Sequence, residues 1–248
     1  MKRLNSVVFI VFVFAATSSG CGVNAPSAQD VLNKSIEKHG YHPNQQLKIG
    51  FDFRENHFEA NIDGGNETYT RVSDQNGNNI VDVISKSSFS RRVNNVEIDI
   101  AHDTLSSQYS DEIKSVLYFA LLPHAANKDV ISRQLMTPIN LNGNPYYKVE
   151  VTYNLNGGGR DFENVFVYWI HQENYTIDYL AYSYYTNGGG VRFREAYNQR
   201  EVNGVVFQDY VNYTIDSDFP AHELDYAFET GLLREVSKID LKNVVVEK

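Results

Sequence analysis

Cysteine is almost absent from this chain, because Cys21 is the only one among its 248 residues. No disulfide bond can therefore form within it, and packing alone must stabilise the fold. Recognised catalytic motifs are also absent: no phosphate-binding loop, dinucleotide fingerprint or nucleophile elbow occurs. The triple-glycine turns at 157–159 and 188–190 lack the following helix that phosphate binding needs.

The sequence also lacks the ligand spacing of a metal site. Only His39 and His42 lie close together among its seven histidines, and neither the spacing of a helical metal pair nor a nearby cysteine accompanies them. We therefore expect no metal and no cofactor. Aspartate and glutamate are plentiful, so a pair of catalytic carboxylates stays open as an alternative.

Positive charge is scarce, with 22 basic against 31 acidic residues and a net charge of −9. Such a surface repels phosphate backbones, which argues against nucleic-acid binding. It also argues against a polybasic membrane-binding patch.

The amino terminus has the features of an export signal. A basic start, Lys2-Arg3, precedes an apolar run from Val7 to Ala16 that is too short to span a bilayer. Ser18-Ser19-Gly20-Cys21 then resembles a bacterial lipobox, with Ser18 where an aliphatic residue is usual. We predict a signal peptide over 1–20, a lipidated tether over 21–26 and one domain over 27–248. The protein would then be exported and anchored to the cell envelope through Cys21, facing the periplasm.

Strand patterns dominate the predicted domain. Residues 47–101 alternate with period two, and residues 162–215 form four runs rich in aromatic and β-branched side chains. Asn203-Gly204 separates the last two runs and predicts a type I′ hairpin, in which Val202 faces Val205. Residues 216–231 form a polar stretch without a predicted element.

Two segments have helical periodicity. Pro26–His39 begins with Ser27 and Asp30 at capping-box spacing, and Gly40 supplies its end. Asp103–Leu122 becomes apolar nearly all round in its last two turns, which predicts a helix buried in the concavity of a curved sheet. Leu117 and Leu121 are its expected core contacts.

This order of elements resembles the LolA/LppX type of periplasmic lipoprotein carrier. The motifs Y-T-I-D-Y-L-A-Y-S-Y, G-G-G-V-R-F-R-E-A-Y-N-Q-R and N-G-V-V-F-Q-D-Y-V-N-Y also resemble a bacterial lipoprotein family with a domain of unknown function. The resemblance implies a mainly β (α+β) fold. In this fold an antiparallel, LolA-like half-barrel wraps around an N-terminal helix and a central helix.

Polar residues in the Asn203-Gly204 hairpin allow two interpretations. An unbroken register pairs Asn198 with Asp209, Tyr197 with Tyr210, and Arg194 with Tyr213. The polar residues of one face could form a cluster at the mouth of a pocket, where arginine binds an anionic head group; they are Arg192, Arg194, Asn198, Arg200 and Asp209. Alternatively, they could be cross-strand pairs that only stabilise the sheet.

Tyrosine combines an apolar ring with a polar tip, so the aromatic strands suit either a wet ligand site or ordinary core packing. We predict binding of a hydrophobic or amphiphilic ligand without catalysis. The alternatives are a periplasmic hydrolase that uses carboxylates and an interaction protein for envelope assembly. The predicted ligand-binding residues are Leu117, Leu121, Tyr168, Trp169, Tyr182, Tyr184, Arg192, Phe193 and Arg194.

Overall fold

The computed structural model describes most of the predicted domain. The described residues are 25–86, 88–100, 105–128, 130–153, 165–184, 189–216 and 219–248. The predicted signal peptide and Cys21 lie outside them.

Sheet A consists of seven antiparallel strands in the order β15-β1-β2-β3-β4-β5-β6. Its tight turns use residues that tolerate positive φ, such as Gly64 and Gly65 between β2 and β3. The strands are β1 (Gln46–Phe53), β2 (Asn56–Asp63), β3 (Asn66–Gln75), β4 (Asn78–Ser85), β5 (Ser88–Val93), β6 (Val96–Ile98) and β15 (Lys242–Glu247).

Sheet B follows the order β14-β13-β12-β11-β10-β9-β7, and β8 also pairs with β9. It contains the aromatic runs that the sequence predicts as consecutive antiparallel strands. The strands are β7 (Val130–Leu135), β8 (Ile139–Leu141), β9 (Asn144–Tyr153), β10 (Val165–His171), β11 (Ile177–Tyr184), β12 (Gly190–Val202), β13 (Val205–Thr214) and β14 (Arg234–Ile239).

The first helix, α1 (Ala28–Lys38), begins as predicted, because Ser27 and Asp30 form a reciprocal capping box. Gly40 follows it with φ of 85°. A Cβ atom there would lie 1.8 Å from the carbonyl oxygen of Gly204, so only glycine lets the chain pass this closely over the β12–β13 turn.

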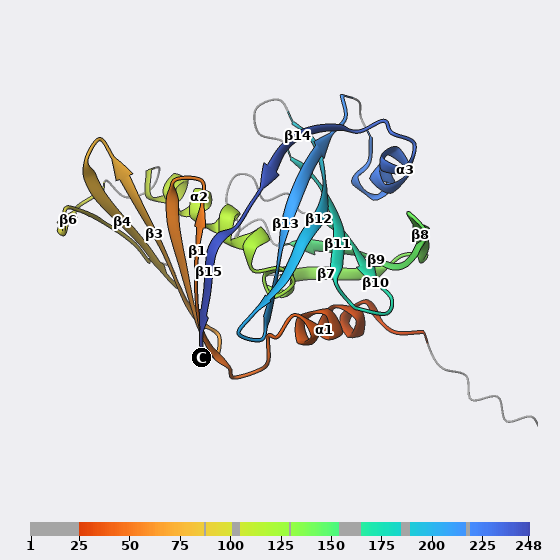
Figure 1. Cartoon of the computed structure of the whole chain (residues 1–248), viewed down its shortest axis with the longest axis horizontal. Coiled ribbons are helices and arrows are strands. Elements are labelled where there is room, and N and C mark those ends of the chain that lie inside the picture. Colours follow the sequence, from red (N-terminus) through yellow and green to blue (C-terminus); the bar gives the residue numbers. More distant parts are fainter. Residues whose placement is uncertain are drawn as a thin grey trace, which may run out of the picture.

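The central helix, α2 (Leu105–Ala120), lies between the two sheets (Figure 1). Its last turns are buried as predicted, and Leu117 and Leu121 are 2% and 1% exposed. They belong to one core cluster that α2 shares with both sheets. The short helix η1 (Ala125–Asn127) leads on to β7.

The structure differs from the prediction after β13, where it contains two short helices. They are η3 (Ala221–Glu223) and α3 (Leu224–Glu229). They occupy the stretch that the sequence left without an element, and they cover the face of sheet B opposite α2 (Figure 1). Ala221, Leu224 and Ala227 are buried there in a second core cluster. Sheet B is therefore covered on both faces.

The β12–β13 hairpin contains a second difference. Val202 pairs with Val205 as predicted, but a β-bulge after Tyr197 shifts the register by one residue. Tyr197 therefore pairs with Asp209, Ala196 with Tyr210 and Arg194 with Asn212. The predicted pairs of Arg194 and Tyr197 are wrong for this reason, whereas the Asn198 side chain still donates to Asp209 at 2.6 Å.

Asp240 and Leu241 carry the chain from sheet B to sheet A, between β14 and β15. Asp209 accepts a hydrogen bond from the Leu241 backbone N–H at 2.9 Å and lies 3.1 Å from Arg200. Arg200 also donates to the Leu241 carbonyl. Part of the polar cluster predicted at a pocket mouth therefore fixes the crossing between the sheets.

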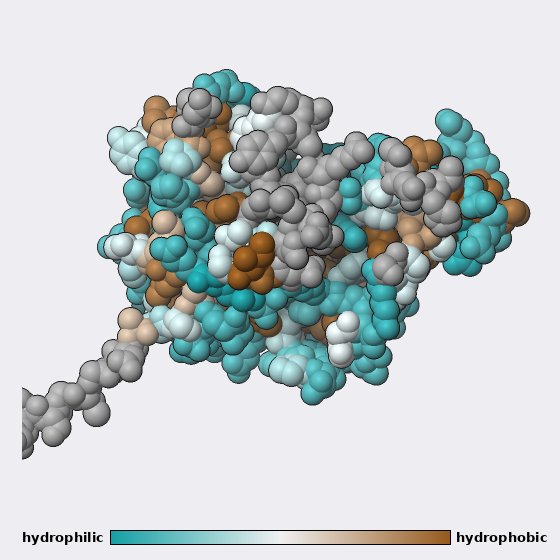
Figure 2. All heavy atoms as spheres, turned by 180° about the vertical axis from the view of Figure 1, so that it is seen from behind, coloured by the Kyte–Doolittle hydropathy of each residue, from teal (hydrophilic) through white to brown (hydrophobic). Residues whose placement is uncertain are grey.

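Within the described residues, strand pairing closes neither sheet into a barrel. Hydrophilic side chains cover much of the back of the molecule, with hydrophobic residues in scattered groups (Figure 2). No described helix is long and apolar enough to cross a membrane.

Candidate functional site

The inner face of sheet B, which packs toward α2, carries most of the predicted site. Alternation along β10 and β11 turns Phe166, Tyr168, Leu180 and Tyr182 into the core cluster of α2. Leu117 of α2 and Leu121 just after it belong to the same cluster. The result is an aromatic and aliphatic wall.

Three tyrosine hydroxyl groups meet in this wall. The hydroxyl of Tyr153 lies 2.6 Å from that of Tyr168 and 3.1 Å from that of Tyr118, and it donates to the Ala126 carbonyl. Tyr118 and Tyr168 are also hydrogen-bonded to each other. Burial raises the pKa of Tyr153 to about 12 and the pKa values of the other two tyrosines further, so all three stay neutral donors.

Two arginines extend from the inner face of β12 next to this wall. Arg192 pairs across strands with Tyr182 and lies over the Tyr184 ring, with its guanidinium carbon 4.5 Å from the ring centroid. Arg194 donates to the Tyr182 hydroxyl at 2.9 Å. Its guanidinium carbon is 5.1 Å from the Phe119 ring centroid and 5.2 Å from that of Tyr182. Aromatic rings thus flank both cations.

Neighbouring strand β13 completes a polar group around them. Asn212 pairs across strands with Arg194, and Thr214 accepts a hydrogen bond from Arg192 at 3.0 Å. We call Tyr182, Arg192, Arg194, Asn212 and Thr214 the arginine patch.

Within the described residues, no carboxylate balances the charge of the arginine patch. Neither arginine forms an ion pair there, whereas the buried cations Arg71, Arg91 and Lys148 each form one. The Arg194 Nε atom and the Asn212 Oδ1 atom are buried without a hydrogen-bond partner. Each such atom costs about 1–3 kcal/mol. The unpartnered donor of Arg194 and the two uncompensated positive charges favour an anion as the missing partner.

The outer face of sheet B receives two of the predicted site residues instead. Trp169 and Phe193 are fully buried in the cluster under α3. Trp169 donates to Asp225 at 3.1 Å, and Lys148 forms an ion pair with the same carboxylate at 2.6 Å. These contacts attach α3 to the sheet, and they separate both aromatic residues from the inner wall.

The structure thus brings seven of the nine predicted ligand-binding residues to one side of sheet B. They are Leu117, Leu121, Tyr168, Tyr182, Tyr184, Arg192 and Arg194. Sequence reasoning missed Asn212 and Thr214 as neighbours of the arginines, because the bulge that places them there has only the turn-tolerant Asn198 (φ 50°) as its signal.

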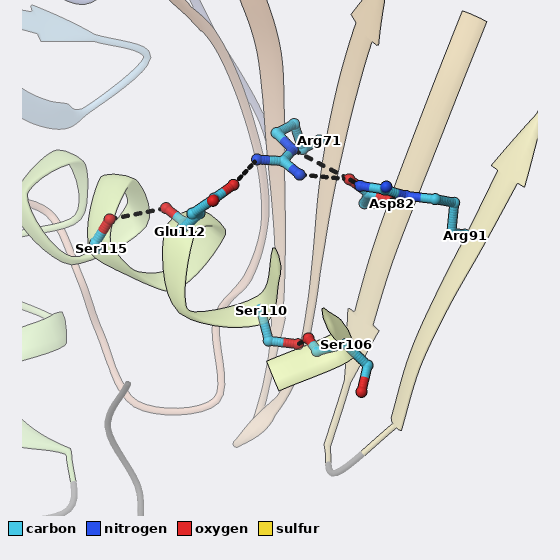
Figure 3. Close-up of polar contacts among 7 residues, drawn as sticks. All are labelled: Arg71, Asp82, Arg91, Ser106, Ser110, Glu112 and Ser115. Atoms are coloured by element: carbon cyan, nitrogen blue, oxygen red, sulfur yellow. Dashed lines mark hydrogen bonds and ion pairs between the residues drawn. The ribbon is translucent and has the colours of Figure 1, made fainter. Parts of the chain in front are cut away.

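A buried ion cluster in sheet A also escaped the sequence analysis. Asp82 is fully buried and accepts hydrogen bonds from Arg71 on β3 and Arg91 on β5 (Figure 3). Arg71 also reaches Glu112 of α2 at 3.0 Å. The guanidinium carbon of Arg91 lies 3.5 Å from the Tyr109 ring centroid. This cluster joins the first half of α2 to the sheet.

A second ionic group lies where α2 ends. His124 and Lys128 both contact the carboxylate of Glu67, and His124 stacks on Tyr41 with ring centroids 4.9 Å apart. Burial raises the pKa of Glu67, but hydrogen bonds from His124 and contacts with Lys128 outweigh it and lower the pKa to about 2. Glu67 is therefore an ion-pair partner at neutral pH and unsuited to donate protons. No group of three or more metal-ligating side chains occurs in the described part of the chain.

Comparison with solved structures supports the fold. A LolA superfamily protein from Nitrosomonas europaea has a TM-score of 0.51 at 12% identity, over 90% of this chain and 95% of that chain. A DUF1329 family protein from Desulfovibrio piger gives 0.42 at 10% identity over 88% and 91%, and the lipoprotein LppX of Mycobacterium tuberculosis gives 0.27 at 9% over 65% and 89%. At these identities the first of them shows a shared LolA-like fold, as predicted from the sequence.

Comparison with sequences identifies the family. No curated protein sequence is significantly similar to this chain. Residues 7–241 match the model of a family of unknown function, DUF6503. This match spans nearly the whole chain, which therefore belongs to the DUF6503 family.

Proposed function

We propose that this protein is a lipid-anchored component of the cell envelope that binds an amphiphilic ligand carrying a negative charge. The arginine patch carries the proposal, since its two cations lack an ionic partner among the described residues. The ligand would lie against the inner face of sheet B beside α2.

The chemistry of this face suits such a ligand. Binding sites for small molecules combine apolar walls with a few convergent polar groups. Tyr182 and the ring of Phe119 offer apolar surface directly beside the Arg194 guanidinium. Arginine binds carboxylate and phosphate groups through two parallel hydrogen bonds, and its charge persists at every physiological pH. The LolA-like fold supports a carrier or binding role because the sheets enclose a helix without closing into a barrel.

The test is binding of amphiphiles to the purified protein. Native mass spectrometry of protein isolated from its own envelope should reveal a co-purified amphiphile. After delipidation, a fatty acid or lysophospholipid should bind again. Because Trp169 lies on the outer face under α3, a fluorescent fatty acid is a better reporter than Trp169 emission.

Arg194→Gln should weaken this binding about tenfold or more, since a hydrogen bond to a charged group contributes about 1.5–3 kcal/mol. Arg92→Gln is the matched control, because Arg92 is exposed on β5 in the other sheet. Absence of any bound amphiphile, or equal affinity of the two variants, would refute the proposed function.

The anchor has its own test. If Cys21 is acylated, radiolabelled palmitate should enter the wild-type protein, and Cys21→Ser should abolish incorporation and release the protein into the soluble periplasmic fraction. Membrane binding depends on the number of acyl chains, and even one chain binds only marginally. A variant without any acyl chain should therefore leave the membrane fraction. Retention of Cys21→Ser in the membrane to the wild-type extent would contradict the lipid anchor.

A further inference from the structure

We propose that the arginine patch is specific for a phosphate monoester head group, as in a lysophosphatidic acid. This inference rests on the proposed function and assigns the class of ligand. It depends on the charge of the patch, the spacing of its two arginines and the free end of Asn212.

Charge favours a dianion. Arg192 and Arg194 bring two positive charges to one face of β12, and the described residues supply no carboxylate to either. A carboxylate or a phosphodiester carries one negative charge and would leave one guanidinium unbalanced. A phosphate monoester carries about −1.5 to −2 at neutral pH, which matches the pair.

Spacing lets one head group contact both cations. The two arginines are separated by one residue on a strand, so their Cα atoms lie about 6.4–6.8 Å apart on the same face. Tyr182 is next to both, because it pairs with Arg192 across strands and its hydroxyl accepts a hydrogen bond from Arg194. A phosphate monoester has three terminal oxygens and can accept hydrogen bonds from two guanidinium groups at once, whereas a carboxylate has two oxygens.

Asn212 can add a third donor. It is 8% exposed, and its amide NH₂ group donates to the Ser237 hydroxyl at 2.8 Å while Oδ1 has no partner. A serine hydroxyl both donates and accepts, so the contact with Ser237 survives a 180° turn of the amide. After that turn, the NH₂ group occupies the present position of Oδ1 and can donate to a ligand. Asn212 pairs with Arg194 across strands, so this donor would lie beside the arginine.

The remaining hydrogen bonds of the arginines fix their positions. Arg192 uses Nη1 for the Val191 carbonyl and Thr214, and Arg194 uses Nη2 for Tyr182. The aromatic rings beside both guanidinium groups displace water from their faces. Weakly hydrated cations held in this way bind a doubly charged oxyanion with little rearrangement.

The experiment compares ligands of equal acyl length. Isothermal titration calorimetry with the delipidated protein, below the critical micelle concentrations, should give at least tenfold tighter binding of lysophosphatidic acid than of lysophosphatidylcholine or the free fatty acid. Arg192→Gln and Arg194→Gln should each remove most of this preference, because each takes away one of the two positive charges. Asn212→Ala should reduce it less, and Arg92→Gln should leave it unchanged.

The outcomes separate the two proposals. Equal affinity for all three amphiphiles overturns the phosphate monoester inference but keeps the proposed function. Binding of none of them overturns the proposed function itself. Glycerol 3-phosphate is the remaining probe: if it binds as tightly as lysophosphatidic acid, the patch is a phosphate site without a role for the acyl chain, and the amphiphile proposal fails.

Discussion

Replacing Asp82 with alanine should lower the free energy of unfolding by about 3–5 kcal/mol, because it leaves Arg71 and Arg91 buried without their shared counter-ion. Both arginines are about nine-tenths buried at the side chain, at 11% and 10% exposure, and Asp82 is fully buried. Arginine stays protonated even when buried, so neither guanidinium can escape the cost by losing its proton. Chemical denaturation followed by circular dichroism measures the loss.

The control for this prediction is Glu97→Ala. Glu97 is an exposed acid on β6 of the same sheet, and its replacement should change stability by less than about 0.5 kcal/mol. Replacing Asp82, Arg71 and Arg91 together with apolar residues of similar size should restore much of the stability, since no unpaired charge is then buried. A triple variant less stable than Asp82→Ala would contradict this account of the cluster.

The second large effect concerns the central helix. Leu117→Ala should destabilise the protein by about 2–5 kcal/mol, because it opens a cavity in the core that α2 shares with both sheets. Leu117 is 2% exposed and lies in the core cluster that includes Tyr168 and Leu180. Thermal and denaturant unfolding of the purified protein both report the change.

Leu105 supplies the matched control for this prediction. It lies on the same helix but is 48% exposed, so Leu105→Ala should cost well under about 1 kcal/mol. Similar stabilities of the two variants would mean that the second half of α2 does not pack as the structure describes.

Local signals explain why much of the fold could be predicted. The capping box at Ser27 and Asp30, the glycine after α1 and the Asn203-Gly204 hairpin all depend on residues close together in sequence. Alternating and aromatic runs likewise indicated most strands.

Long-range contacts explain what was missed. Arg71, Asp82 and Arg91 come from three strands, so only their side-by-side pairing in the sheet reveals a cluster. The cover of sheet B was missed because α3 is only six residues long and carries acids among its apolar side chains. One buried acid, Asp225, binds Trp169 and Lys148, which no local pattern indicates.

The candidate site was predictable in its residue types but not in its geometry. Alternation places Tyr168 and Trp169 on opposite faces of β10, yet the sequence could not tell which face meets α2. The bulge after Tyr197 also decides which β13 residues accompany Arg194. Asn212 became its neighbour through one extra residue in β12.

The pairing of β1 with β15 sets the order in which the protein can be completed. Lys48 lies opposite Glu247, so β1 pairs with a strand that is made long after it. Until β15 has been synthesised, β1 has only β2 beside it in sheet A. A contact so distant in sequence makes folding slow. Sheet A would therefore stay incomplete until β15 pairs with β1.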